Sequence, residues 1–394
     1  MILPATALAS ALLFAPEAAS TEPVAGQAPR RATLFLDFGG GLLGGGQQAG
    51  EASCVEGEAF TYPIFLGREH AADIAVEEAR RILEPYGVRA VGEPPPPWLP
   101  FTHVRIGGSP GVLKLEDDRL NGLACTIDCG DEVHVDTVFV FADKWISHAV
   151  PNGEAERELA LQVGRIAVHE AGHAWGLEHT GGSESVMARF PSVLSPVFTP
   201  GCQQLDLDSG VDEAGDCGAT HVGFCPAGTQ NADAELLALF GSGEPDTVAP
   251  QARFVWPPDG LTLVPGETLE VEVEVTDDFG GAGWMLEVPE LQWEHVPVDP
   301  SQTAISLVVP EGELTLRLEA MDHDRNFTEV EVHVSVVAEE LVEEMDTGEG
   351  PQASCACRMP ASPRAWSWWG LVAAGLLILR GRSRSRDATR HFHH

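Results

Sequence analysis

One eleven-residue stretch, from His169 to His179, constrains this chain more than any other feature. It carries three histidines in the pattern H-E-x-x-H-x-x-G-x-x-H. His169 and His173 stand four positions apart, so on a helix they lie on one face and point toward a common position. Gly176 adopts a positive φ at no steric cost, so it can end the helix and turn the chain back. This turn would bring His179 beside the other two histidines.

Three imidazoles that converge in this way form a ligand set for zinc. Neutral imidazole is a good zinc ligand, and three protein ligands leave the fourth position to water, as in catalytic zinc sites. Zinc lowers the pKa of such a water toward about 7. Glu170 is offset from the histidine face and can accept a proton from that water as a general base. We therefore predict one catalytic Zn²⁺ ion on His169, His173 and His179, with Glu170 as the catalytic residue.

The extended motif resembles that of the metzincin zinc endopeptidases, whose signature adds a methionine turn downstream. Met187 follows His179 by eight residues and is the matching position. The resemblance implies that this methionine forms a hydrophobic floor beneath the metal without binding it. The chain continues as Ala188-Arg189-Phe190, without the tyrosine that some metzincins have there. The resemblance also implies hydrolysis of peptide bonds in a protein or peptide substrate that binds in extended form.

The elements before the motif follow the order of the upper half of a metzincin catalytic domain. Hydrophobic patterns predict strands at 32–38, 88–91, 101–106 and 133–141, and helices at 70–84 and from 153 through the motif. The resemblance implies an α+β fold in which a mixed sheet packs on two long helices and an edge strand pairs with the substrate. We expect 133–141 to be that edge strand. The zinc protease domain would span 32–240 and close with a short helix at 232–240.

Residues 250–338 change to a strict alternation of apolar and polar residues, which is typical of an all-β domain. The alternating runs are 269–275, 314–318 and 330–336, and turn residues separate them. The pattern resembles immunoglobulin-like modules of bacterial surface proteins and predicts a β-sandwich after a linker at 241–249. Its scattered histidines, His295, His323 and His333, are expected at the surface.

The two ends of the chain indicate export. Residues 1–20 have the apolar run and small-residue cleavage site of a signal peptide, although a positively charged start is missing, and 21–31 form a short leader. An acidic stalk at 339–354 precedes a tail at 355–394, which has a two-cysteine motif, a hydrophobic segment and an arginine cluster. This tail resembles the tripartite sorting tails of myxobacterial surface proteins. The resemblance implies attachment to the membrane through the tail before processing, and a final location at the outer cell surface or outside the cell.

A plain C-terminal membrane anchor is the alternative for the tail. Arginines after a hydrophobic segment fit the cytoplasmic side of a membrane. The apolar run at 366–379 is short for a spanning helix.

Charge and cysteine content narrow the remaining interpretations. A net charge of −37 disfavours nucleic-acid binding through a basic surface. Six cysteines between Cys54 and Cys225 favour disulfides in an exported chain, with the pairing open. A second zinc site on Cys125 and Cys129 is an alternative that lacks a further ligand pair. The acidic loop at 206–213 is compatible with Ca²⁺, but its spacing departs from an EF-hand loop and favours a solvated loop.

The leading hypothesis is a secreted, surface-associated zinc endopeptidase. The alternative is a surface adhesion or binding protein in which zinc only stabilises the domain. The intact Glu170 argues against this alternative, because binding alone does not require that carboxylate. The sequence specifies neither the substrate nor the oligomeric state.

Overall fold

The computed structural model describes residues 29–43, 60–67, 70–125, 127–132, 134–143, 153–181, 183–189, 196–207, 216–297 and 302–338. The predicted signal peptide, the acidic stalk from 339 and the tail lie outside these residues, and so does most of the acidic loop at 206–213. Among the helices that are described, none is long and apolar enough to cross a membrane.

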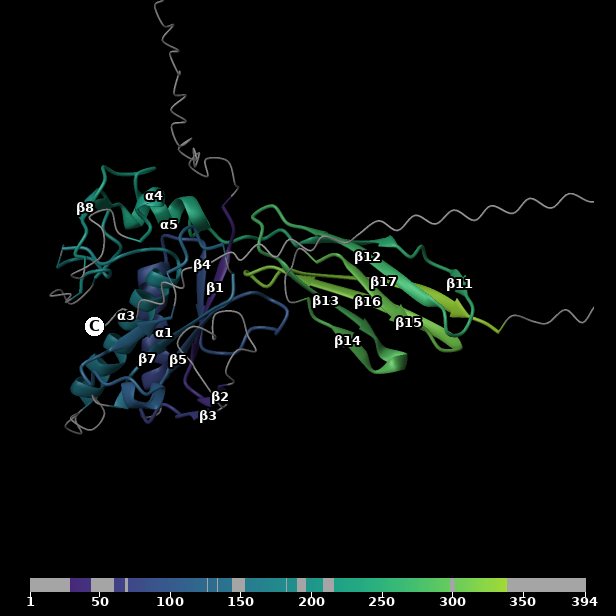
Figure 1. Cartoon of the computed structure of the whole chain (residues 1–394), viewed down its shortest axis with the longest axis horizontal. Helices are drawn as coiled ribbons and strands as arrows, with labels where there is room; N and C mark the ends of the chain where they lie inside the picture. The colour runs from purple at the N-terminus through teal and green to yellow at the C-terminus, as the bar shows by residue number, and fades with distance from the viewer. Residues whose placement is uncertain are drawn as a thin grey trace, which may run out of the picture. The chain divides into compact units, whose positions relative to one another are not determined.

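A five-stranded mixed sheet lies at the centre of the first region (Figure 1). Its strands are β1 (Ala32–Asp37), β4 (Val88–Val91), β5 (Thr102–Ile106), β6 (Gly122–Ala124) and β7 (Asp136–Val140). Their order is β4-β1-β5-β7-β6. The first four of these run parallel to their neighbours, whereas β6 pairs antiparallel with β7.

The expectation that 133–141 forms the edge strand was wrong. β7, the strand in that segment, lies between β5 and β6, and all of its residues are buried. A continuous apolar run is the pattern of a strand that is covered on both faces, which fits an inner position. The edge beside it is β6, a strand too short to show any periodic pattern in the sequence.

Two long helices, α1 (Ala71–Leu83) and α3 (Gly153–Ala174), pack against each other and against one face of the sheet (Figure 1). They share a buried core with the sheet residues Leu34, Val104 and Val138. A Cβ added at Gly164 of α3 would lie 2.3 Å from the carbonyl oxygen of Ala75 in α1. The two helices can therefore approach closely only because this position is glycine.

The opposite face of the sheet is covered by shorter elements, including β2 (Gly41–Leu43), β3 (Phe60–Tyr62) and the 3₁₀ helix η1 (Pro110–Leu113). Phe139 of β7 and Leu123 of β6 pack into this second cluster. The two faces of the sheet are therefore buried by different parts of the chain.

The segment after the histidine motif is rich in loops. It holds β8 (Gln203–Gln204), α4 (Gly218–His221), β9 (Thr229–Gln230) and the closing helix α5 (Ala232–Phe240). Disulfides join Cys129 to Cys217 and Cys202 to Cys225, and Cys125 is disulfide-bonded as well. The alternative of a zinc site on Cys125 and Cys129 is therefore excluded.

The second region consists of two sheets that enclose one core. One sheet has the order β10-β12-β15, with β10 (Gln251–Trp256), β12 (Thr268–Thr276) and β15 (Ala304–Val308). The other sheet has the order β11-β17-β16-β13-β14. Its strands are β11 (Leu261–Leu263), β13 (Gly283–Val288), β14 (Trp293–His295), β16 (Gly312–Met321) and β17 (Phe327–Val336). The 3₁₀ helix η2 (Pro289–Leu291) connects β13 to β14 in the chain. Alternate residues of both sheets, such as Val271 and Leu316, share the core, so this region is β-rich, which is compatible with the predicted sandwich.

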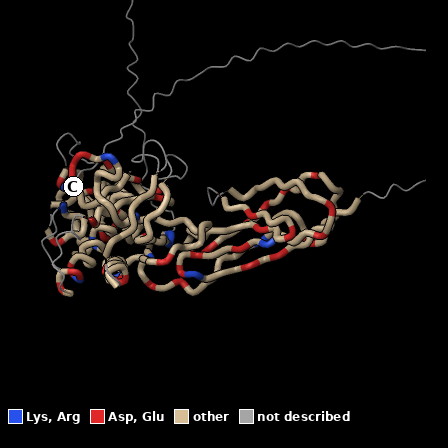
Figure 2. The backbone as a smooth tube through the Cα atoms, turned by 90° about the horizontal axis from the view of Figure 1, so that it is seen from below, with Lys and Arg blue, Asp and Glu red and all other residues tan. Residues whose placement is uncertain are grey.

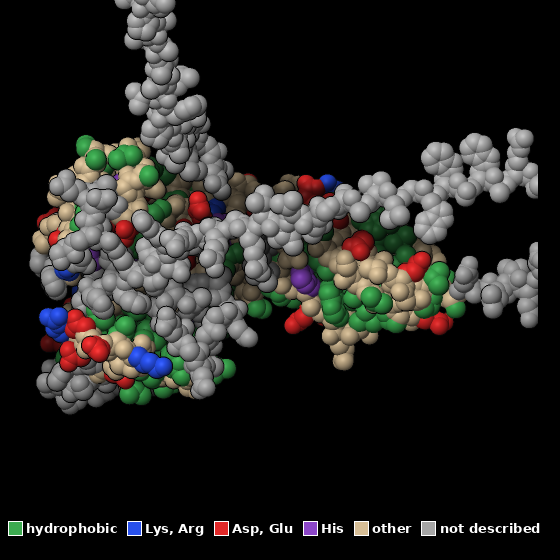
Figure 3. Space-filling model, in the orientation of Figure 1, with side chains coloured by type: hydrophobic (Ala, Val, Ile, Leu, Met, Phe, Trp, Pro, Cys, Tyr) green, Lys and Arg blue, Asp and Glu red, His purple; other side chains and the backbone are tan. Residues whose placement is uncertain are grey.

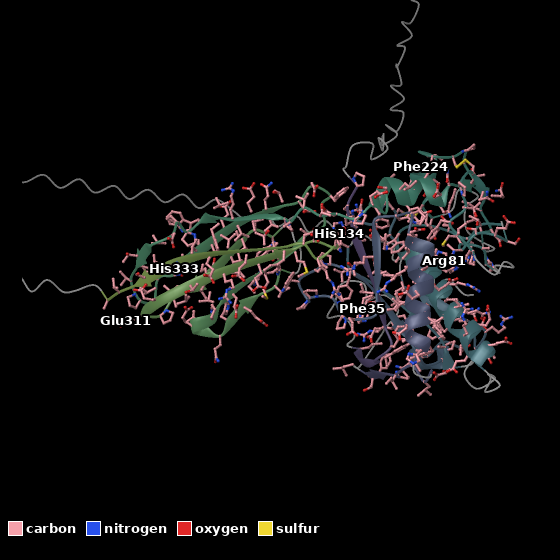
Figure 4. The ribbon with its side chains drawn as sticks, turned by 180° about the vertical axis from the view of Figure 1, so that it is seen from behind. Phe35, Arg81, His134, Phe224, Glu311 and His333 are labelled. Carbon is pink, nitrogen blue, oxygen red and sulfur yellow. A yellow bond between two sulfur atoms is a disulfide. The ribbon has the colours of Figure 1, made fainter. Side chains whose placement is uncertain are left out.

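The histidines of the sandwich differ from each other in environment. His333 lies at the surface, as expected (Figure 4). His323 is buried, and its Nδ1 lies 2.9 Å from Oγ1 of Thr33 in β1, so its expected surface position was wrong. It follows Asp322 directly after β16, and a position just beyond a strand has no alternation from which burial could be predicted.

Acidic residues outnumber basic ones in both regions (Figure 2). On the near face of the sandwich, acidic side chains stand among hydrophobic ones (Figure 3). The strong negative charge of the chain is therefore distributed over the molecule.

Candidate metal centre

The helix that carries the motif ends at a glycine-based cap. Gly176 has a φ of 89°. The Leu177 amide donates to the Gly172 carbonyl (2.8 Å) and the Gly176 amide to the His173 carbonyl (2.9 Å), which is the bond pair of a Schellman motif. A Cβ added at Gly176 would lie 2.8 Å from the Asp128 carbonyl oxygen. Glycine therefore serves both the left-handed turn and the close approach of a neighbouring loop.

This turn brings the three motif histidines together. Nε2 of His173 lies 3.2 Å from Nε2 of His169 and 3.3 Å from Nε2 of His179. Two nitrogen ligands of a tetrahedral zinc ion, each about 2.05 Å from the metal, are about 3.3 Å apart. All three side chains are buried. The donor set and its spacing therefore fit zinc.

Backbone carbonyl groups orient two of these rings. Nδ1 of His169 lies 2.6 Å from the carbonyl oxygen of Val186, and Nδ1 of His173 lies 2.7 Å from that of Leu177. Because a carbonyl only accepts, each Nδ1 carries the hydrogen and each Nε2 keeps its lone pair. Burial lowers the pKa of His169 to about 4, and burial together with the nearby His169 lowers the pKa of His173 to about 3. Both rings are therefore neutral near pH 7, as metal ligation requires.

Glu170 lies against the edge strand β6. Its side chain is buried, and the amide of Ala124 donates to its carboxylate. Burial raises the pKa of Glu170 well above its ordinary value, and the hydrogen bond from Ala124 opposes that shift. Oε2 of Glu170 has no hydrogen-bond partner among the residues that are described. One oxygen of this carboxylate is therefore held by the strand, and the other is available to a proton.

Gly122, also in β6, lies against Glu170, a contact that was not predicted from the sequence. A Cβ added there would lie 2.3 Å from Oε1 of Glu170. The strand can approach the carboxylate only because this residue has no side chain. A glycine between Asn121 and the short apolar run Leu123-Ala124-Cys125 is the sequence signal for this contact, and it is a weak one.

Met187 is fully buried beneath α3. A Cβ added at Gly172 would lie 2.6 Å from Sδ of Met187, so glycine at that position lets the methionine approach the helix. The Met187 amide donates to Oγ of Ser185, and the Thr180 amide donates to the Met187 carbonyl. The turn with Met187 is thereby bonded to the segment that follows His179.

A buried ionic cluster of Glu178, His221 and Glu235 was also not predicted from the sequence. Nδ1 of His221 lies 2.8 Å from Oε2 of Glu235, and its Nε2 lies 3.7 Å from Oε1 of Glu178. Burial alone would lower the pKa of His221, but its interactions with Glu178 and Glu235 outweigh burial and raise that pKa to about 9. Glu178 also accepts from the amide of Cys217. Three residues so far apart in the chain form no motif, so the sequence carries no signal for this cluster.

Comparisons with known proteins bear on this region. The family model "Matrixin" (Peptidase_M10) matches residues 113–200, which include β6, β7, α3 and all three motif histidines. No curated protein matches the chain.

Three solved structures are similar to parts of the chain. The fibronectin(III)-like modules of Clostridium thermocellum CbhA share 17% identity, over 24% of this chain and 50% of that chain, with a TM-score of 0.20. The endo-beta-1,4-mannanase from Thermotoga petrophila shares 22% identity, over 34% of this chain and 30% of that chain, with a TM-score of 0.20. The PKD1 domain of Vibrio anguillarum Epp shares 21% identity, over 23% of this chain and 100% of that chain, with a TM-score of 0.17. The chain thus spans about half the length of the first of them, and TM-scores at this level assign no fold. The matrixin match supports a metzincin-like, zinc-metallopeptidase-like domain in the part of the chain that holds the three histidines.

Proposed function

We propose that this chain is a zinc-dependent endopeptidase. The observation that carries the proposal is the convergence of three Nε2 atoms, two of them on rings fixed as neutral by backbone carbonyls, beside the buried carboxylate of Glu170. Zinc held by His169, His173 and His179 would polarise a substrate carbonyl and supply a nucleophile near neutral pH. The matrixin match over this segment supports the same class of activity.

Glu170 is the proton carrier in this proposal. Its Oε2 accepts the proton that the attacking water loses, and the carboxyl group then donates that proton to the leaving amine. The hydrogen bond from Ala124 and the close contact with Gly122 fix the carboxylate during both transfers.

The edge strand β6 is the proposed position for an extended substrate. In the described part of the sheet, β6 pairs only with β7. The other edge of β6 can therefore form main-chain hydrogen bonds with a peptide. The same strand contacts Glu170 through Gly122 and Ala124. A peptide that adds to β6 would therefore lie beside the proton carrier.

Export to the cell surface is also part of the proposal. It rests on the signal-like residues 1–20 and on the sorting-type tail at 355–394. Disulfides Cys129–Cys217 and Cys202–Cys225 support an oxidising location. We propose that the tail attaches the chain to the membrane before processing.

The test is a digestion of a peptide library by the purified protein, with 1,10-phenanthroline as the chelator. We expect cleavage to stop on chelation and to return when zinc, but not calcium, is added back. Cleavage that continues unchanged after zinc removal would contradict the proposal. Tight zinc binding without cleavage of any peptide would instead indicate the adhesion or binding alternative.

A further inference from the structure

A cluster of carboxylates lies where the chain enters the β-sandwich. Asp246 precedes β10, Asp277 and Asp278 follow β12, and Asp322 follows β16. Asp246, Asp277 and Asp278 each offer an oxygen, and these oxygens all lie within 4.8 Å of one another. Oxygens that bind one calcium ion at about 2.4 Å are at most about 4.8 Å apart. The three carboxylates therefore already satisfy the geometric limit for a shared ion.

Two oxygens of this cluster are buried without a donor. Asp246 is only 6% exposed, and its Oδ1 accepts from the Val248 amide (2.8 Å). Its Oδ2 has no hydrogen-bond partner among the described residues, and neither does the buried Oδ1 of Asp277. A buried carboxylate oxygen without a donor is costly, and a bound cation would satisfy both atoms.

The surroundings of the cluster are negative. Burial raises the pKa of Asp277 to about 6, and the charges of Asp246, Asp322 and Asp278 add to this shift. Burial also raises the pKa of Asp322, with further contributions from Asp246 and Asp324. In the part of the chain that is described, Asp246, Asp277, Asp278 and Asp322 form no ion pair, although Arg31 lies nearby, 3.9 Å from Asp324 and with its guanidinium over the Phe279 ring.

Hydrogen bonds fix Asp246 to the sandwich. Nδ2 of Asn326 donates both to Oδ2 of Asp322 (2.7 Å) and to the carbonyl oxygen of Asp246 (3.0 Å). The Asp246 amide donates to Oδ2 of Asp324 (3.2 Å). The cluster is therefore preorganised by the loops that carry it, although its members are far apart in sequence.

We propose that Asp246, Asp277 and Asp278 bind one calcium ion at the entrance of the β-sandwich. Carboxylate and carbonyl oxygens suit calcium, whereas zinc favours nitrogen and sulfur ligands. Magnesium demands shorter bonds and near-ideal octahedral geometry, which irregular loops seldom provide. The site does not depend on the three histidines or on peptidase activity.

The test is calorimetric titration of CaCl₂ into the zinc-loaded full chain, together with thermal unfolding. We expect one calcium ion per chain and an increase of several degrees in the unfolding temperature. Asp277→Asn should weaken calcium binding at least tenfold. Without calcium, the same variant should unfold at or above the wild-type temperature, because it removes one of several neighbouring negative charges.

Glu272→Gln is the matched control, since Glu272 is an exposed carboxylate on β12, the strand that Asp277 follows. This variant should bind calcium as the wild type does. Three results would each overturn the proposal: no heat and no thermal shift at millimolar calcium, an equal loss of affinity in both variants, or an equal shift with magnesium. A variant Asp277→Asn that is less stable than the wild type without calcium would also contradict it.

Discussion

The two candidate metal sites of this chain differ in burial and in the kind of group that they present: three buried histidines in one, and a buried, a half-buried and an exposed carboxylate in the other. Burial lowers the pKa of His169 and His173 and raises the pKa of Asp277, since it disfavours the charged form of each. The histidines therefore keep the neutral lone pairs that zinc binds, whereas the neighbouring carboxylates repel one another's negative charge, which a bound cation would compensate. Donor chemistry, and not burial, distinguishes a zinc site from a calcium site in this molecule.

Loss of the third histidine should have the largest effect and should separate the two sites. We expect His179→Asn to weaken zinc binding more than about 100-fold and to reduce peptide cleavage to background, because a three-ligand site becomes a two-ligand site. The thermal shift with calcium should remain. Zinc content by elemental analysis, cleavage rate and unfolding temperature with calcium are the measurements. Retention of stoichiometric zinc would show that His179 is not a ligand.

Gly122→Ala should affect catalysis next most strongly. The added Cβ would push the Glu170 carboxylate or β6 away, and a displacement of that size can cost about 100-fold in rate. We expect kcat/KM to fall by about that factor while zinc content stays at one ion per chain. Gly153→Ala is the control, because a Cβ added there meets no atom of the described residues within 4 Å. Similar rates for the two variants would contradict the role of Gly122.

The cluster around His221 predicts a pH dependence of stability. The pKa of His221 is about 9 in the folded protein and about 6.5 in an unfolded chain, so its stabilising effect is fully present below pH 6.5 and is lost as the pH rises toward 9. The loss should amount to at most about 3.5 kcal/mol, since one pKa unit corresponds to about 1.4 kcal/mol.

Urea unfolding of the zinc-loaded protein between pH 6 and 9.5 measures this effect. His221→Gln should flatten the profile, whereas His333→Gln, at an exposed position, should not change it. A flat profile in the wild type would indicate that His221 is neutral in the folded state.

Met187→Leu should have the smallest effect. Leucine and methionine have similar volumes, so we expect a loss of less than about 1.5 kcal/mol in the free energy of unfolding. Zinc content and cleavage should persist, because Met187 is not proposed as a ligand. Loss of zinc from a well-folded variant would show that this side chain shapes the metal site more directly.

The zinc site could be predicted from sequence because its residues are local. Three histidines, a glutamate and a helix-ending glycine lie within eleven residues, and helix geometry together with the turn at Gly176 places them together. The carboxylate cluster proposed to bind calcium could not be predicted, since Asp246 meets Asp277 and Asp278 only after the strands of the sandwich have formed. The ionic cluster of Glu178, His221 and Glu235 was missed for the same reason.

The fold shows the same division between local and distant information. The long helices and alternating strands followed their periodic patterns closely, as α1 and β12 illustrate. The edge strand was assigned wrongly because β6 has only three residues and carries no periodicity. The position of β6 beside β7 and the contact of β6 with Glu170 arise only from tertiary packing.

The most direct test of the proposed function is the comparison of Glu170→Gln with the wild type. Zinc content and cleavage rate are measured on the same preparations. The substitution keeps the shape of the side chain and removes its ability to accept a proton. We expect one zinc ion per chain in both proteins and a cleavage rate about 10³-fold lower in the variant. Undiminished cleavage by a zinc-loaded Glu170→Gln protein would contradict the role of Glu170 and, with it, the proposed mechanism.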